Sequence, residues 1–293
     1  MQKITSKLLC GILGFIFSAC LKKFPKTIRV ECTNSCNARC TICPHKNMTR
    51  KVEFMSDTLY EKIIRECAEN SCRVLHLHNF GEPLLDKKLE QRIRYAKSNG
   101  IPRVKIFTNG SLLTEDRSRS LIEAGLDEIK VSFDGASRHE FEDIRTPLKY
   151  DDVVKNVRKL VKLRNELRSS MKIFVACCST QDRSETMNLI ASEVDGFSFG
   201  KIHNWAGEQE HNSPSRIRKP CERIWNTFTI LANGDVALCC LDHDGQVILG
   251  HLDDKTSIRD IFTNAEYKRI RKLHSAALQE SIPLCKNCTK SFL

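Results

Sequence analysis

The chain has 293 residues, 41% hydrophobic and 28% charged, a composition that excludes a disordered chain and a small disulfide scaffold. Lysine and arginine outnumber the acidic residues by 47 to 36, so the formal net charge is +11 and acidic partners are favoured. The basic residues are scattered and no basic run is interleaved with aromatics, so we expect a solvated basic surface and no nucleic-acid partner.

Residues 1–26 form an apolar N-terminal extension. An almost wholly apolar run extends from Leu8 to Leu21, with lysines on both sides. The run resembles the apolar part of a signal peptide, and residues 17–20 loosely resemble a lipoprotein cleavage site. It is shorter than the roughly 20 residues that a spanning helix needs. We expect a segment that packs on the protein or lies against the cytoplasmic side of a membrane, with export as the alternative.

Over residues 27–205, short β-rich runs alternate with amphipathic helices. One helix is predicted to begin behind Ser56 as its N-cap, and another spans Asp151–Arg168. Six repeats of strand and helix imply a parallel sheet with right-handed crossovers, so we predict an α/β fold, a partial (β/α)6 TIM-like barrel. Chemistry in such barrels gathers at the C-terminal ends of the strands. The predicted strands are Thr27–Cys32, Arg73–His78, Arg103–Thr108, Glu128–Phe133, Lys172–Cys177 and Gly196–Ile202.

Residues 206–293 are predicted to form a second, smaller domain. A polar linker opens it, and its apolar core is so small that a metal site would help to hold it together. We therefore predict a β-hairpin-plus-helix domain that binds a metal cluster. Its predicted elements are strands Thr227–Leu231 and Asp235–Leu238 around an Asn233-Gly234 turn, and one helix from about Ser257 to Leu273.

Fifteen cysteines indicate either disulfides or metal ligation. Their spacing favours metal ligation, and hence a reducing, cytoplasmic compartment. The strongest signal is Cys36-Asn-Ala-Arg-Cys40-Thr-Ile-Cys43, directly after the first strand. Three thiolates in one loop can reach three corners of an iron–sulfur cubane and leave the fourth iron open to a ligand. On spacing alone, a zinc site with a fourth ligand such as His45 is the alternative.

A Cys-x3-Cys-x2-Cys loop after the first strand of a βα barrel resembles the radical S-adenosylmethionine (SAM) superfamily. In that family the open iron binds SAM, and reductive cleavage yields a 5′-deoxyadenosyl radical that abstracts hydrogen from the substrate. The resemblance implies a 4Fe-4S cluster on Cys36, Cys40 and Cys43. It also implies an external electron donor such as flavodoxin or ferredoxin.

Three further motifs, each at a strand end, resemble those of the same superfamily: Gly81-Glu82-Pro83, Thr108-Asn109-Gly110 and Ser132-Phe133-Asp134-Gly135. In Gly81-Glu82-Pro83, the backbone carbonyls and Glu82 would receive the SAM amino group, because a charged ammonium needs acceptors. In the last motif, Ser132 and Asp134 would suit the ribose hydroxyls.

No motif marks the catalytic residues. After the fifth strand, Thr180 and Arg183 are candidate contacts for SAM or substrate, with a surface position as the alternative for Arg183. Cys177 or Cys178 is a candidate hydrogen-atom donor, as in some radical SAM epimerases, and a buried apolar role is the alternative. His203 is a candidate cavity residue, with a core or linker position as its alternative.

A second cysteine set lies in the C-terminal domain. Four thiolates complete either a cluster or a zinc ion. The arrangement resembles the SPASM/twitch extension of radical SAM enzymes, and the twitch form implies one auxiliary 4Fe-4S cluster. The spacing after Gly234 favours Cys239 over Cys240. The set is Cys221, Cys239, Cys285 and Cys288.

The whole layout resembles the twitch-domain dehydrogenases, such as the deoxyinosamine dehydrogenase of aminoglycoside biosynthesis. This resemblance implies oxidation or epimerisation of a sugar, cyclitol or similar polar small molecule. The net charge of +11 would suit phosphorylated, nucleotide-linked or lipid-linked saccharides. The alternatives are a maturase that modifies a ribosomally made peptide and a non-catalytic zinc or cluster protein.

Overall fold

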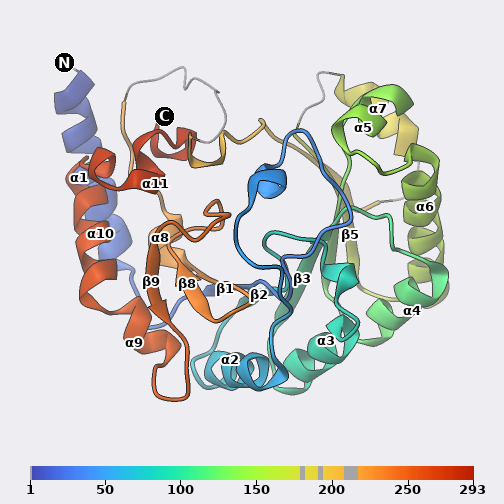
Figure 1. Ribbon diagram of the computed structural model, residues 1–293, viewed down its shortest axis with the longest axis horizontal. Coiled ribbons are helices and arrows are strands. Elements are labelled where there is room, and N and C mark those ends of the chain that lie inside the picture. Colours follow the sequence, from blue (N-terminus) through green and yellow to red (C-terminus); the bar gives the residue numbers. More distant parts are fainter. Residues whose placement is uncertain (1, 179–181, 191–193, 208–216) are drawn as a thin grey trace.

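A single open sheet organises the chain. The computed structural model describes residues 2–178, 182–190, 194–207 and 217–293 (Figure 1). Within these residues the strands follow the order β6-β5-β4-β3-β2-β1-β7-β8-β9. Strands β1 to β6 are parallel, each beside its successor, and helices α2 to α7 connect them along the outside of the sheet. The prediction of an α/β fold with a partial barrel is confirmed.

The six parallel strands lie where the sequence predicts them, although four of them end one to three residues earlier. In β3, Val104 and Ile106 are buried on one face, whereas Lys105 and Phe107 are half-buried on the other. This period of two places alternate side chains under the helices and inside the barrel. The strands are β1 Thr27–Val30, β2 Val74–His76, β3 Arg103–Thr108, β4 Glu128–Ser132, β5 Lys172–Cys177 and β6 Gly196–Phe199.

The connecting helices bury one apolar stripe each. Ser56 caps α2 as predicted, since its side chain accepts a hydrogen bond from the Leu59 backbone N–H. The stripe of α6 ends at Leu163, because Leu167 lies in the C-cap and is exposed. The helices are α2 Asp57–Glu69, α3 Leu89–Ser98, α4 Glu115–Glu123, α5 Arg138–Ile144, α6 Tyr150–Glu166 and α7 Arg183–Ile190.

The C-terminal hairpin extends the barrel sheet. Strand β7 pairs in parallel with β1, and β8 and β9 continue the sheet antiparallel. The predicted single helix after Ser257 is wrong: Asn264 interrupts it and caps a second helix by accepting a bond from the Tyr267 N–H. The elements are β7 Thr227–Ile230, β8 Asp235–Ala237, β9 Ile248–His251, α8 Arg223–Asn226, α9 Ile258–Phe262, α10 Ala265–Ser275 and α11 Pro283–Lys286.

The apolar N-terminal run forms helix α1, Gln2–Ala19, which lies along α10 at the left edge of Figure 1. Gly14 permits this close approach, because a Cβ there would lie 2.1 Å from the Ser275 hydroxyl oxygen. Ser6 accepts a hydrogen bond from the Arg218 backbone N–H at 2.9 Å. No helix within the described ranges is both long and apolar enough to cross a membrane.

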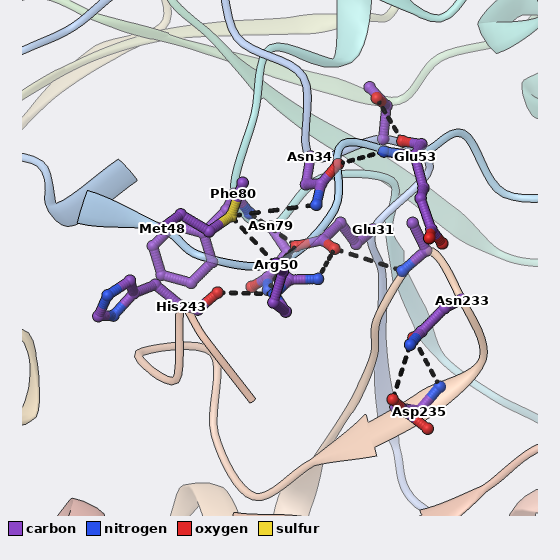
Figure 2. Close-up of polar contacts among 12 residues, drawn as sticks. Glu31, Asn34, Met48, Arg50, Glu53, Asn79, Phe80, Asn233, Asp235 and His243 are labelled. Carbon is purple, nitrogen blue, oxygen red and sulfur yellow. Dashed lines mark hydrogen bonds and ion pairs between the residues drawn. The ribbon is translucent and has the colours of Figure 1, made fainter. Parts of the chain in front are cut away.

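The carboxylate of Glu31, directly after β1, joins four segments of the chain (Figure 2). Its side chain is fully buried, and Arg50 donates one guanidinium N–H to each oxygen, at 2.8 and 3.0 Å. The backbone N–H groups of Phe80 and Ala232 also donate to it, each at 3.3 Å. These contacts connect the end of β1 to the loops that follow Cys43, β2 and β7.

Removal of either partner of this buried pair is expected to destabilise the protein. Glu31→Gln or Arg50→Gln should each lower the free energy of unfolding by about 3–5 kcal/mol, because the remaining group stays buried without its charge partner. Urea denaturation of anaerobically purified protein measures the change. The control is Lys51→Gln, because Lys51 is 85% exposed and lies 3.8 Å from Glu53, a pair worth at most about 1 kcal/mol. Equal stability of all three variants would contradict the assignment.

Candidate active site

A cavity of about 400 Å³ lies at the C-terminal ends of the parallel strands, where barrel chemistry was expected. Residues at or directly beyond the C-terminal ends of four successive strands line it, including Asn79, Asn109, Ser132 and Cys178. The loop after β1 also contributes its three predicted cluster cysteines, Cys36, Cys40 and Cys43. The strand-end motifs and the cysteine loop therefore share one space.

The three thiols of this loop suit an iron–sulfur cluster. Burial raises the pKa of Cys36 to about 12 and that of Cys43 to about 11, so these thiols need nearby positive charge to ionise. The Arg145 guanidinium lies 3.9 Å from the Cys40 sulfur. In the described part of the chain, no three His, Cys, Asp or Glu side chains converge as ligands of a single metal ion. Cluster ligands bind separate irons and need not converge on one point.

Backbone contacts hold the cysteine loop in place. The N–H of Arg39 donates to the Thr146 carbonyl at 2.7 Å, and that of Thr41 to the Ile144 carbonyl at 2.9 Å. His45, the fourth ligand in the zinc alternative, has its Nε2 2.7 Å from the Asn34 carbonyl oxygen. That ring nitrogen is therefore engaged within the loop.

Gly81 brings the loop after β2 against the cysteine loop. Its φ is +96°, and a Cβ there would lie 2.7 Å from the carbonyl oxygens of both Thr33 and Ser35. The next backbone N–H, of Glu82, donates to the Ser35 carbonyl at 2.7 Å. Only glycine accommodates both this φ and this approach. Pro83 begins a short 3-10 turn, Pro83–Leu85, and does not line the cavity.

The Glu82 carboxylate lines the cavity and is held by three donors. The Thr108 hydroxyl donates at 2.6 Å, and the backbone N–H groups of Asn109 and Leu84 donate at 2.7 and 3.1 Å. Burial nevertheless raises the pKa of Glu82 to about 7. A cationic group in the cavity would favour the ionised form.

The Thr108-Asn109-Gly110 motif therefore has a positioning role that the sequence did not reveal. Besides holding Glu82, it reaches the cysteine loop, where the Asn109 side chain donates to Asn37 at 2.8 Å. Asn37 in turn donates to the Ser111 hydroxyl at 2.9 Å. Three motifs that are remote in sequence thus form one hydrogen-bonded unit.

Ser132 lines the cavity, whereas Asp134 lies behind it. The Asp134 carboxylate is fully buried and accepts hydrogen bonds from the Cys178 backbone N–H and from Arg145, whose Nε lies at 2.8 Å. Burial opposes the charge of Arg145, but Asp134 outweighs this and raises the pKa of the guanidinium. Arg145 lines the cavity and was missed from sequence, because no motif marks it.

The remaining candidate residues divide between the cavity and other positions. Cys178 and His203 line the cavity, and burial lowers the pKa of His203 to about 4. Cys177 is buried outside the cavity lining. Arg183 is exposed and lies 5.3 Å from the Phe199 ring centre. Thr180 lies outside the described residues.

The second cysteine set lines a separate, smaller cavity. Cys240 instead lines the larger cavity, so the structure places Cys239 with the other members of the set. Arg223 and Leu241 line both cavities and separate them. The members of the set are Cys221, Cys239, Cys285 and Cys288.

The sequence matches models of two protein families. Residues 30–188 match the Radical SAM superfamily, and residues 221–289 match the SPASM iron-sulfur cluster-binding domain. The S-adenosyl-L-methionine-dependent 2-deoxy-scyllo-inosamine dehydrogenase of Niallia circulans is 24% identical over 274 residues, which cover 92% of this chain and 94% of that protein. The GTP 3′,8-cyclase of Chlorobaculum tepidum is 32% identical over 135 residues, 46% of this chain and 40% of that protein.

Solved structures share the fold. BtrN in complex with AdoMet and 2-DOIA superposes with a TM-score of 0.65 and 21% identity, covering 92% of this chain and 94% of that chain. SuiB of Streptococcus suis bound to the precursor peptide SuiA superposes with a TM-score of 0.68 and 13% identity, covering 94% and 74%. Because the Radical SAM match includes 159 of the 293 residues, the chain belongs to the radical SAM superfamily and is an enzyme with a C-terminal SPASM domain.

Proposed function

We propose that this enzyme forms a 5′-deoxyadenosyl radical from SAM and takes hydrogen from a sugar or cyclitol, which is oxidised or epimerised. The observation that carries the proposal is that the two cysteine sets line two cavities which share Arg223 and Leu241 as lining residues. Cys36, Cys40 and Cys43 line the larger cavity, and Arg223 separates that cavity from the second set. A substrate in the larger cavity would lie between them. The near full-length match to a cyclitol dehydrogenase supports the same reaction class.

The chain's own residues would bind and orient SAM. A 4Fe-4S cluster on the three loop cysteines would supply the electron that cleaves SAM. Glu82 would accept the SAM ammonium, Ser132 would contact the ribose, and Asp134 would act by holding Arg145. The net charge of +11 favours an acidic external electron donor such as flavodoxin or ferredoxin.

Aromatic residues would restrict solvent access to the cavity. The Trp205 Nε1–H donates to the Ile42 carbonyl in the cysteine loop at 2.6 Å. Its ring lies 5.7 Å from the ring of Phe80 and 5.8 Å from that of His203. Exclusion of water protects a reactive radical from side reactions.

A ribosomally made peptide is the second candidate substrate, because SuiB, which has the same fold, was solved with a precursor peptide. The cavity would then receive one side chain of the peptide rather than a free small molecule.

Formation of 5′-deoxyadenosine tests the proposed radical chemistry. Anaerobically reconstituted enzyme with SAM and dithionite should release it, and the Cys36→Ala/Cys40→Ala/Cys43→Ala variant should not, because no thiolate remains to bind the cluster. Chromatography and mass spectrometry measure the product. A cluster-loaded wild type that leaves SAM intact would refute the proposal. Stimulation by polyols or by peptides separates the two substrate classes.

We also propose one auxiliary 4Fe-4S cluster on the second cysteine set. Cys239→Ala should lower iron from about eight to about four or fewer atoms per chain, because a cubane missing one ligand is lost or degraded. Cys240→Ala is the matched control and should retain the iron, since Cys240 lies on the other cavity. Iron analysis with Mössbauer spectroscopy measures both. Loss of iron in Cys240→Ala alone would reverse the assignment.

Helix α1 is proposed to lie on an anionic membrane surface on the cytoplasmic side. Its small residues Ser6, Cys10 and Gly14 face the protein, which reverses the usual orientation of an amphipathic helix. Residues 1–30 contain six lysines and arginines and no Asp or Glu, so the charged side chains of this segment are all basic. The large apolar residues point outward: Ile4, Leu8, Ile12, Phe15 and Ile16 are exposed by 73, 65, 53, 74 and 47%.

Vesicle co-sedimentation tests this contact. Wild-type protein should bind phosphatidylglycerol vesicles more tightly than phosphatidylcholine vesicles, and Leu8→Glu/Phe15→Glu should weaken binding at least about 10-fold because apolar contact is lost. Leu167→Glu, at a site 38% exposed outside α1, is the control and should bind like wild type. Unchanged binding of the α1 variant would contradict the proposal.

A further inference from the structure

The cavity of the proposed radical reaction carries an excess of positive charge. Three arginines line it: Arg29 from β1, Arg145 from the loop after α5, and Arg223 from α8. Among the described lining residues, Glu82 is the one carboxylate that faces them. Asp134 balances the charge of Arg145, whereas no ion pair among the described residues includes Arg29 or Arg223.

Arg29 has no carboxylate partner in the described part of the chain. Its Nε is buried without a hydrogen-bond partner, and its Nη1 lies 2.8 Å from the Nε2 of His78. A half-buried guanidinium without a counter-charge is costly, because its lost hydration is not replaced. An anion bound beside Arg29 would remove this cost.

His78 does not balance the charge of Arg29. Burial, followed by the charge of Arg29 itself, holds the pKa of His78 well below its usual value, so the ring carries no charge. A neutral imidazole has one acceptor nitrogen, and two donors approach the ring: the Arg29 Nη1 lies 2.8 Å from Nε2, and the Phe107 backbone N–H lies 3.1 Å from Nδ1. The ring therefore satisfies at most one of these donors and supplies no negative charge to the guanidinium.

Arg223 lies on the same side of the cavity. Its Nη1 donates to the Cys240 sulfur at 3.3 Å. Helix α8 leads directly into β7, which pairs with β1, the strand that carries Arg29. Arg29, Arg223 and Cys240 all line the larger cavity. Arg223 also borders the second cysteine set, whose thiolates would offset its charge, whereas Arg29 does not line that smaller cavity.

We propose that the substrate carries a phosphoryl group and that Arg29, assisted by Arg223, binds it. The substrate class is then a phosphorylated sugar or cyclitol, and this inference rests on the proposed function. A phosphate monoester has about two negative charges and three oxygens that can be contacted from different directions, whereas a carboxylate offers two oxygens in one plane. The amine of an inosamine, protonated at neutral pH, would be repelled by the same arginines.

Binding to the reconstituted holoenzyme with SAM, without reductant, tests the proposal by isothermal titration calorimetry. The probes are myo-inositol 1-phosphate and glucose 6-phosphate, their unphosphorylated parents, and 2-deoxy-scyllo-inosamine. The phosphorylated probes should bind about 10- to 100-fold more tightly than their parents, as expected for charged hydrogen bonds. Equal binding of phosphorylated and parent compounds, or preference for the inosamine, overturns the proposal.

Variants assign this preference to Arg29. Arg29→Gln should abolish it, Arg29→Lys should retain part of it, and both should leave SAM affinity unchanged. Arg103→Gln is the matched control, since Arg103 is on the same sheet but pairs with Glu128 outside the cavity lining. If Arg29→Gln weakens SAM binding instead, or weakens phosphorylated and parent probes equally, the assignment is wrong.

Release of 5′-deoxyadenosine by the same samples keeps this inference separate from the proposed function. Release without a phosphate preference refutes the inference alone. If no deoxyadenosine forms, the proposed function fails, and the calorimetry still decides whether Arg29 binds phosphoryl groups.

Discussion

The buried carboxylate of Glu31 is the contact through which the barrel, the cysteine loop and the C-terminal strands hold one another in place. Arg50 comes from beyond the cysteines, Phe80 from the loop after β2, and Ala232 from the turn of the hairpin. A buried carboxylate is costly unless it is paired and hydrogen-bonded, so these segments stabilise the protein together rather than separately. The same residue follows β1, the strand that pairs with both β2 and β7.

The site depends on this arrangement because its motifs are held by hydrogen bonds to one another. Gly81 allows the loop after β2 to lie in backbone contact with the cysteine loop. The Asn109 side chain, from the loop after β3, donates a hydrogen bond to Asn37 in the same cysteine loop. Glu82 sits between them with three donors. Such mutual support holds reactive groups in fixed positions, which is what a reaction through a short-lived radical requires.

Electrostatics distinguish this cavity from a general polyol pocket. Arg145 is neutralised by Asp134, and Arg223 adjoins thiols that would become negative on binding metal. Arg29 remains without a described counter-charge. In the proposed function, this charge would influence the choice of ligand, because a partly buried charge without a partner disfavours neutral and cationic compounds.

The sequence determined the family and the six parallel strands, and it predicts the two cysteine sets, because local periodicity and thiol spacing do not depend on distant contacts. It favoured Cys239 over Cys240 by spacing, but it could not place Asp134 behind the cavity, because a motif does not fix the direction of a side chain. It also could not identify Arg145 and Arg29, which no motif marks. It also missed the break at Asn264 and the pairing of β7 with β1. Tertiary structure decided these points, because the direction of a side chain and the partner of a charge depend on segments far apart in the chain.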